Sequence, residues 1–367
     1  MYKNEKIQVS GREFFAAANS GRGFVSFYDE IFKSDGIERR YLIKGGPGTG
    51  KSTFMRRLSN EAEKRGMQVE RYRCSSDPAS LDGIIINGRV AVIDSTAPHS
   101  EEAEFVGARD VLVDLGAFWN SDGLYSEFDR INTLTAKKKR AYSLAYRFLS
   151  AAMQSDMASR ELVMPYVDKR RVERIARRLT RNIGSDGGYE CKVGLSSAIG
   201  MSGRCRVDTY ASIAQKTVYI EEHYGIGYLV LCGICEVARN KGCRISVSYE
   251  PLLPDFPDAV FFEESKILFA LCEPRRQRAV SIRRVLDISS LSKREKNALK
   301  AESRYAKRIS EALIDAASDE LKSAGDAHFE LEGIYKRYMD FERLDFYTAE
   351  LTDQIISFLE CKIKPKQ

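Results

Sequence analysis

The chain of 367 residues lacks a long uncharged apolar run. Its longest such stretch, Tyr224 to Cys235, is far shorter than the roughly 20 residues that a membrane-spanning helix needs. The first residues, Met1 to Lys6, also lack the apolar segment of a secretory signal. These absences exclude a helical membrane protein and predict a cytoplasmic one.

Regular cysteine spacing and strong net charge are missing as well. The eight cysteines are scattered, which favours reduced thiols over a disulfide framework. Cys232 and Cys235 form the one close pair, and we expect both to fill a helix core as small apolar residues, with a redox or metal site as the alternative. A net charge of +6 is too weak to imply a polyanionic partner by itself.

What the chain does contain is a glycine-rich stretch placed directly after the apolar residues 41–43. It comprises Gly45, Gly46, Pro47, Gly48, Thr49, Gly50, Lys51, Ser52 and Thr53. This spacing fits the P-loop (Walker A) template, in which backbone N–H groups surround a polyphosphate. Lys51 would neutralise the β- and γ-phosphates, Ser52 would ligate Mg²⁺, and Thr53 could reach the α-phosphate. A glycine-rich turn without a ligand is the alternative.

An acidic residue, Asp94, follows the short apolar run 90–93. In a sheet with the P-loop, the carboxyl end of this strand would face the bound phosphates, so we expect Asp94 to hold Mg²⁺ together with Ser52. An ordinary turn residue is the alternative. Many hydrolytic P-loop enzymes carry glutamate next, whereas this chain has Ser95, so we expect slow hydrolysis.

Two further residues, Asp77 and His99, are candidates for positioning a nucleophile. Neither lies in a motif with a known mechanism, and a histidine in a turn is more often solvated or capping than a base. Glu101 is a third nearby carboxylate.

Apolar periodicity predicts a parallel sheet covered by helices on both faces. The expected strands are 41–44, 68–73, 90–94 and 111–115, and the expected helices are 24–32 and 52–65, the second capped by Gly66. From residue 122 to 183 the pattern becomes helical, with a break near Pro165. This indicates a helical hairpin appended to the sheet.

The second arm of that hairpin carries arginines at helical spacing. Arg170, Arg174, Arg177 and Arg181 fall on one face. Such a face could hold the phosphates of a nucleic acid or a substrate. A solvated face, or one docked on acidic surface of the same protein, is the preferred interpretation because no aromatic or glycine-rich RNA motif accompanies it.

The chain also repeats itself at an offset of about 177 residues. Residues 219–235 lie over 42–58, and Gly225 and Gly227 match Gly48 and Gly50. We therefore predict four consecutive segments. These are a P-loop α/β half (1–121), a helical hairpin (122–185), a degenerate P-loop half (186–289) and a second hairpin (290–367).

The second copy lacks the residues that the chemistry needs. Tyr228, Leu229 and Ala270 take the places of Lys51, Ser52 and Asp94, and Glu221, Glu222 and His223 occupy the first loop positions. Carboxylates without a lysine would repel a triphosphate. We expect this half to bind no nucleotide and to pack as a pseudo-partner of the first.

The chain resembles a family of uncharacterised bacterial proteins built as tandem P-loop ATPase-like halves. The resemblance covers nearly all of it and rests on residues 43–53, Cys74 with Asp77-Pro78, Ile93-Asp94 with residues 96–99, and Phe118-Trp119. It implies a P-loop fold and nucleotide binding, and strengthens Asp77 and His99 as site residues. Family members often keep a recognisable second P-loop, and this chain departs from that pattern.

We expect one ATP-Mg²⁺ site, in the first half, in a slow ATPase that acts as a switch or with an unknown protein or small-molecule partner. GTP is disfavoured because no Asn-Lys-x-Asp motif occurs. An arginine of the second half, Arg204, Arg275 or Arg276, could stabilise transferred phosphate. The alternatives are a small-molecule kinase with the hairpin as a lid and Asp77 as base, and a non-catalytic adaptor, possibly on nucleic acid.

Overall fold

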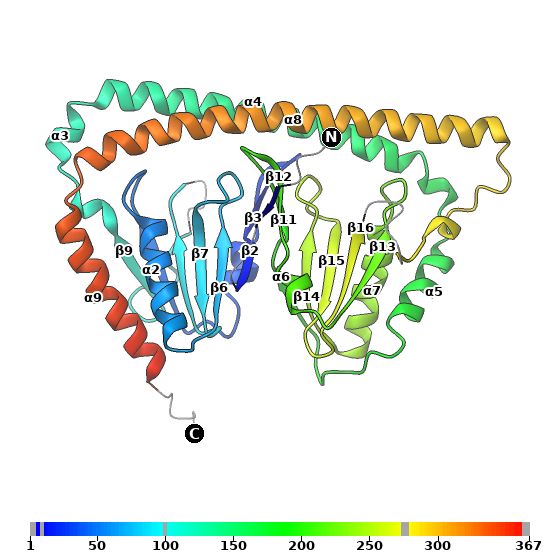
Figure 1. The fold of residues 1–367 in the computed structure, drawn as a ribbon, viewed down its shortest axis with the longest axis horizontal. Coiled ribbons are helices and arrows are strands. Elements are labelled where there is room, and N and C mark those ends of the chain that lie inside the picture. Colours follow the sequence, from blue (N-terminus) through cyan, green and yellow to red (C-terminus); the bar gives the residue numbers. More distant parts are fainter. Residues whose placement is uncertain (1–4, 8–10, 98–100, 273–278, 362–367) are drawn as a thin grey trace. The chain divides into compact units, whose positions relative to one another are not determined.

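The structure is a computed structural model that describes residues 5–7, 11–97, 101–272 and 279–361 (Figure 1). It shows an α/β protein whose main β-sheets are mixed and flanked by helices. The chain forms two compact units. The first unit carries the predicted P-loop, residues 45–53, and is called the P-loop unit after that prediction; it contains Ser10–Ala16, Ser26–Ser143 and Glu320–Gln367. The second unit contains Met1–Val9, Ala17–Val25 and Leu144–Asp319.

The P-loop unit is built on a six-stranded sheet. Its spatial order is β2 (Arg12–Phe15), β6 (Val69–Arg73), β7 (Leu81–Ile86), β8 (Val90–Asp94), β5 (Arg39–Lys44) and β9 (Asp110–Asp114). Neighbouring strands are parallel except that β7 runs antiparallel to both β6 and β8. The strand that precedes the P-loop, β5, is therefore hydrogen-bonded to the strand that ends in Asp94.

The prediction of a parallel sheet missed β7, and a local turn explains its direction. Asn87 and Gly88 have φ of 52° and 66°, and the Arg89 N–H donates to the Ile86 carbonyl at 3.0 Å. Positive φ at both central residues defines the type I′ turn that joins antiparallel strands tightly. The Asn-Gly pair after an apolar run is the sequence signal for this hairpin.

Helices of the P-loop unit cover its sheet and complete its core. They are α1 (Tyr28–Phe32), α2 (Lys51–Lys64), the 3₁₀ helix η1 (Leu115–Phe118), α3 (Ser121–Tyr125) and α9 (Phe341–Glu360). Met55 and Leu58 of α2 are fully buried in one cluster with Leu351 and Ile355 of α9. Gly66 ends α2 in the left-handed conformation, which confirms the predicted cap.

The predicted helix over residues 24–32 is only partly right. Residues Gly23–Ser26 form strand β4, which pairs with β3 (Ala17–Ser20), and the helix α1 is limited to Tyr28–Phe32. Gly23 has a φ of +93°, which turns the chain back into the β3–β4 hairpin before α1 begins.

The second unit contains a five-stranded sheet and a smaller one. The larger has the order β10 (Glu190–Val193), β14 (Arg244–Tyr249), β15 (Pro257–Phe262), β16 (Ile267–Cys272) and β13 (Lys216–Glu221), and the smaller has the order β1 (Glu5–Ile7), β12 (Gly203–Val207) and β11 (Ser197–Gly200). Its helical elements include η2 (Met164–Tyr166), α5 (Lys169–Leu179), α6 (Thr209–Ile213), α7 (Tyr228–Lys241) and η3 (Arg283–Val285).

The larger sheet of the second unit has the strand order and directions of β2, β6, β7, β8 and β5. β5 and β13 are 177 residues apart at both ends, as are α2 and α7. Strand register also corrects one predicted match. Asp94 lies opposite Ile43, and Leu271 lies opposite Ile220, so Leu271 rather than Ala270 has the place of Asp94.

Two long helices, α4 (Phe128–Glu161) and α8 (Lys293–Arg337), each contribute residues to both units. The predicted break near Pro165 is confirmed, because α4 ends before it and η2 contains it. The units are discontinuous and do not follow the four predicted segments. The reason is packing: α9 buries its apolar face in the core that contains α2, and α5 packs on α7.

The buried face of α7 is also not the one predicted. Val230, Leu231, Ile234 and Ala238 are buried, whereas Cys232 is exposed, so the expectation that Cys232 fills the core is wrong. All eight cysteines are free thiols. Within the described residues no group of three or more His, Cys, Asp or Glu side chains could hold a metal ion.

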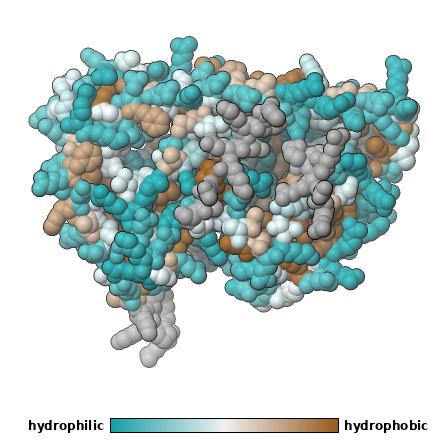
Figure 2. All heavy atoms as spheres, viewed as in Figure 1, coloured by the Kyte–Doolittle hydropathy of each residue, from teal (hydrophilic) through white to brown (hydrophobic). Residues whose placement is uncertain are grey.

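The surface agrees with the mixed composition. Hydrophilic side chains predominate on the face shown in Figure 2, and hydrophobic ones gather there only in small groups. In the described part of the chain, no helix combines the length and apolar character needed to span a membrane.

Candidate functional site

The P-loop joins β5 to α2 through a backbone that only glycine adopts readily. Gly45, Gly48 and Gly50 have φ of 147°, 74° and 79°, and α2 begins at Lys51 immediately after the last of them. Side chains at these positions would be strained. The glycines that the sequence motif requires therefore sit where the backbone needs them.

The loop presents a set of unused backbone donors. Among the described residues, none accepts a hydrogen bond from the main-chain N–H groups of Gly46, Gly48, Thr49, Gly50, Lys51, Ser52 and Thr53. The first main-chain bond of the helix runs from the Phe54 N–H to the Gly50 carbonyl, at 2.9 Å. Free N–H groups at a helix start, with the positive end of the helix dipole, favour an anion.

The Lys51 side chain folds back over its own loop. Its Nζ donates to the carbonyls of Gly45 and Gly46 at 2.8 and 2.9 Å, and it lies 3.7 Å from Asp94 Oδ2. The predicted pairing of loop lysine and strand-end carboxylate at one edge of the sheet is present in the structure. A polyphosphate held by the loop would meet this ammonium.

Ser52 and Asp94 are the predicted Mg²⁺ ligands. Ser52 Oγ accepts from the Leu81 N–H at 3.0 Å, and Asp94 Oδ1 accepts from the N–H and hydroxyl of Thr96. Asp94 Oδ2 lies 3.7 Å from Lys51 Nζ and accepts no hydrogen bond from the residues that the structure describes, so it could bind a metal ion. One hydroxyl and one carboxylate suit Mg²⁺, which takes its other ligands from phosphates and water. The residues therefore fit the ion.

The remaining predicted site residues, Asp77, Thr49 and His99, differ in what the structure shows of them. Both carboxylate oxygens of Asp77 accept hydrogen bonds from its own turn, from the Ala79 N–H at 3.1 Å and the Ser80 hydroxyl at 2.8 Å. That is a turn-capping arrangement, which competes with a role as a base. Thr49 is buried and donates to the Gly46 carbonyl at 3.0 Å, which stiffens the loop. His99 lies outside the described residues.

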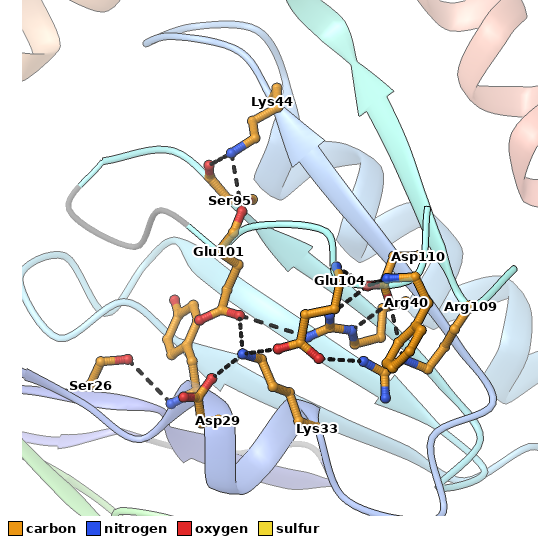
Figure 3. Close-up of polar contacts among 12 residues, drawn as sticks. Ser26, Asp29, Lys33, Arg40, Lys44, Ser95, Glu101, Glu104, Arg109 and Asp110 are labelled. Carbon is orange, nitrogen blue, oxygen red and sulfur yellow. Dashed lines mark hydrogen bonds and ion pairs between the residues drawn. The ribbon is translucent and has the colours of Figure 1, made fainter. Parts of the chain in front are cut away.

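The turn after Asp94 is tied to the P-loop strand. Lys44, the last residue of β5, donates through Nζ to the carbonyls of Ser95 and Glu101 at 2.7 and 3.2 Å (Figure 3). The Ser95 hydroxyl donates to the same Glu101 carbonyl at 2.5 Å. Ser95 is thus committed to the turn and is not a substitute for the glutamate of hydrolytic P-loop enzymes.

A buried ion-pair cluster fixes the base of this turn (Figure 3). Arg40 of β5 is fully buried and binds Asp110 in a bidentate manner, with both nitrogen–oxygen distances at 2.8 Å. This contact holds the pKa of Asp110 well below its ordinary value. Around the pair, Lys33 Nζ lies 2.8 Å from Glu104 and 3.5 Å from Glu101. The network clamps β5 to the start of β9.

The helix α8 packs directly on the P-loop. A Cβ atom at Gly48 would lie 3.0 Å from the Glu332 carbonyl, and one at Gly46 would lie 3.0 Å from the ring of Trp119. Trp119, the only tryptophan of the chain, also contacts Tyr335 of α8, with 5.1 Å between ring centroids. Loop and helix therefore touch through backbone and rigid rings, so a change in loop shape would reach α8.

Sequence reasoning missed three residues near the loop. Lys138 and Tyr142 belong to α4 and His328 to α8, elements without a motif. Burial lowers the pKa values of Lys138 and His328, and the positive charge of Lys51 lowers both further. Burial raises the pKa of Tyr142 to about 12, although its hydrogen bond with Ser76 opposes the change. Only tertiary packing brings these side chains to the P-loop.

A fourth missed residue is Asp82, the second residue of the unpredicted strand β7. It is buried, and its charge raises the pKa values of Tyr28, Cys74 and Tyr142, for which burial is the larger cause. The preceding residue, Leu81, donates to Ser52. Asp82 is therefore a second carboxylate at this edge of the sheet.

The equivalent loop of the second unit is filled by its own side chains. Glu222 Oε1 accepts a hydrogen bond at 3.0 Å from the N–H of Gly227, the residue just before α7. Burial raises the pKa of Glu222, and the nearby Arg160 charge opposes that rise. Arg160 donates to the Gly225 carbonyl and stacks on Tyr228, with 5.3 Å to the ring centroid. A carboxylate thus occupies the helix start that an anion would need.

Other charged candidates of the second unit have partners there. Arg204 pairs with Glu250 at 2.6 Å, and Glu221 pairs with Arg283 at 2.9 Å. Arg275 and Arg276 lie outside the described residues. Arg170, Arg174 and Arg177 of the predicted basic face are exposed on α5, while Val172 and Ala176 on the opposite face are buried. Arg181 is exposed too, but it follows the helix, which ends at Leu179, so the predicted face is one arginine shorter. It is thus a solvated face in this unit.

Comparison with known proteins found no matching family model, curated protein or solved structure.

Proposed function

We propose that this protein binds ATP with Mg²⁺ at residues 45–53 and that it is a slow ATPase acting as a switch. The observation that carries the proposal is the loop itself. Seven main-chain N–H groups without acceptors among the described residues, together with the Lys51 ammonium, form a site that suits a triphosphate in charge and donor pattern.

Mg²⁺ would be held by Ser52 and Asp94 and would supply charge neutralisation between the β- and γ-phosphates. Lys51 would exchange its bonds to the loop carbonyls for phosphate oxygens. Neighbouring strands β5 and β8 place Lys51 and Asp94 on the same edge of the sheet, which supports this division of roles.

We further propose that the chain is an internal duplication related to tandem P-loop ATPase-like proteins, with one competent site. Matching strand orders and the 177-residue spacing support the duplication. Glu222 supports the single site, since its half-buried carboxylate already accepts a hydrogen bond from the Gly227 N–H of the second loop. The Glu222 carboxylate would thus occupy the place of a phosphate in the second loop, in addition to repelling a triphosphate by its charge.

Slow turnover and a switching role follow from the surroundings of the loop. Ser95 stands where a water-orienting glutamate would stand and is bonded to the Glu101 carbonyl. The contacts of Gly46 and Gly48 with Trp119 and Glu332 offer a direct route from bound phosphate to α8. A nucleotide-dependent loop shape would then be read by that helix.

Calorimetric titration of Mg-ATP into the intact chain tests the proposal. We expect one equivalent to bind, with slow phosphate release that needs no acceptor. Two equivalents would contradict the single site, and no binding would contradict the function as a whole.

A small-molecule kinase is the second candidate. The buried Asp82 and the half-buried Tyr142 favour it, because they bring a carboxylate and a hydroxyl together next to Leu81, whose N–H binds Ser52 of the loop, and an acceptor could be oriented there. ADP production that depends on an added acceptor would support this alternative over the ATPase.

A further inference from the structure

Lys138 is a cation in an unusual place on α4. Leu134 and Ala141, one turn to either side of it, are buried, so Lys138 lies on the helix face that packs inward and is itself half-buried. In the described part of the chain it makes no hydrogen bond or ion pair. A half-buried ammonium without a partner costs stability unless an anion joins it.

The packing of α4 on α8 directs this face toward the P-loop. Leu134 shares a small core with Leu331 and Ile334 of α8, next to Glu332, whose main chain contacts the loop. Lys138 lies one turn after Leu134, and His328 lies one turn before Glu332. The two helices thus bring Lys138 and His328 to the same side of the loop.

The charges around Lys138 are predominantly positive. Burial is the main cause of its lowered pKa, and the ammonium groups of Lys51 and Lys139 lower it further. His328 has its pKa lowered by burial, then by Lys138 and Lys51, while Glu332 and Asp77 act in the opposite direction. The ammonium groups of Lys138 and Lys51 therefore share one region of excess positive potential, and the His328 ring beside them is neutral near pH 7 because its pKa is lowered.

We propose that Lys138 binds the terminal phosphate of the triphosphate held by the P-loop, as a second lysine supplied by α4. This inference rests on the proposed function and adds a residue to its site. The P-loop backbone surrounds the inner phosphates, and Lys51 spans the β- and γ-groups. The Lys138 ammonium, which does not belong to the loop, suits the γ-phosphate. Of the three phosphates, this one carries the largest charge and would be the least enclosed by the loop.

The inference predicts discrimination between ATP and ADP. Lys138→Met removes the charge while keeping an apolar stem, and we expect it to weaken Mg-ATP binding about 10- to 100-fold, the effect of one charge-assisted hydrogen bond. Binding of ADP should change by less than about threefold. Lys139→Met, at the exposed neighbouring lysine, is the matched control and should change neither.

Fluorescence of the single Trp119, which contacts Gly46, reports both titrations, with calorimetry as a second readout. Lys138→Met should also leave the thermal stability of the nucleotide-free protein unchanged or raised, because it removes an unpaired cation. Lys138→Gln serves as the second variant and should reproduce the selective loss of ATP affinity.

Two results would overturn the inference: unchanged ATP affinity in both Lys138 variants, or an equal loss for ATP and ADP. A wild-type protein that binds no ATP would instead refute the proposed function. The two failures are therefore distinguishable.

Discussion

Replacement of Lys51 by alanine is the most direct test of the P-loop. In the free protein its ammonium contacts two loop carbonyls at 2.8 and 2.9 Å and lies 3.7 Å from Asp94. The alanine variant cannot neutralise an incoming triphosphate. It also leaves the Asp94 carboxylate next to the phosphates without a nearby ammonium.

The expected magnitude follows from these contacts. Loss of one charge-assisted hydrogen bond costs about 1.5–3 kcal/mol. Exposure of the phosphates to an uncompensated Asp94 adds about 1 kcal/mol in a partly solvated site. The sum of about 2.5–4 kcal/mol corresponds to roughly 60- to 700-fold weaker binding of ATP.

Trp119 fluorescence and calorimetry measure this loss, and circular dichroism checks that the variant is folded. Tyr228→Ala in the second loop is the matched control, because Tyr228 has the place of Lys51 at the 177-residue offset. It should leave nucleotide binding unchanged. Equal effects of the two replacements, or ATP affinity within threefold of wild type for Lys51→Ala, would refute the assignment of roles.

Three other replacements test the surrounding structure. Gly48→Ala should lower the free energy of unfolding by about 1–2 kcal/mol, because alanine is strained at the Gly48 φ of +74°. The loss should exceed that of the control Gly88→Ala, which has a similar φ of +66° but whose Cβ would meet no atom within 4 Å. An equal loss in the two variants would contradict the tight contact of Gly48 with α8. Asp110→Asn strands the buried Arg40, so urea unfolding at pH 7 should show a loss of about 3–5 kcal/mol. Because the folded pKa of Asp110 is depressed, that stability is present above its unfolded pKa and is lost as pH falls, so the gap to wild type should narrow in acid. The pKa of Glu222 is raised in the folded protein, so its ionisation destabilises the fold as pH rises through that pKa. Glu222→Gln should therefore be more stable than wild type near pH 8 but not near pH 4. A stability difference that does not change with pH would contradict a carboxylate that ionises in the folded protein.

The sequence predicts the loop and its immediate chemistry because these are local. A glycine at each strained φ, a lysine and a serine at the helix start, and an aspartate after an apolar run are fixed by short-range geometry. The 177-residue offset likewise located β13 and α7 before the structure did. Binding of ATP stays a prediction.

Sequence patterns predict less well those features that depend on tertiary packing, such as strand direction and the buried face of a helix. The strand β7 was missed although Asn87-Gly88 marks its hairpin, and its direction makes the sheet mixed. The sequence pattern places Cys232 in the core, whereas the structure buries its neighbour Leu231 and leaves Cys232 exposed. Helical periodicity predicts which face of a helix is apolar, but it does not predict which other part of the protein packs against that face.

The sequence by itself determined which loop is proposed to hold a phosphate, because the residues of a P-loop are consecutive. Only the tertiary structure decided what surrounds that loop. Lys138 and His328 come from helices far along the chain. Contacts between residues so distant in sequence depend on which apolar faces bury one another, which no local motif encodes.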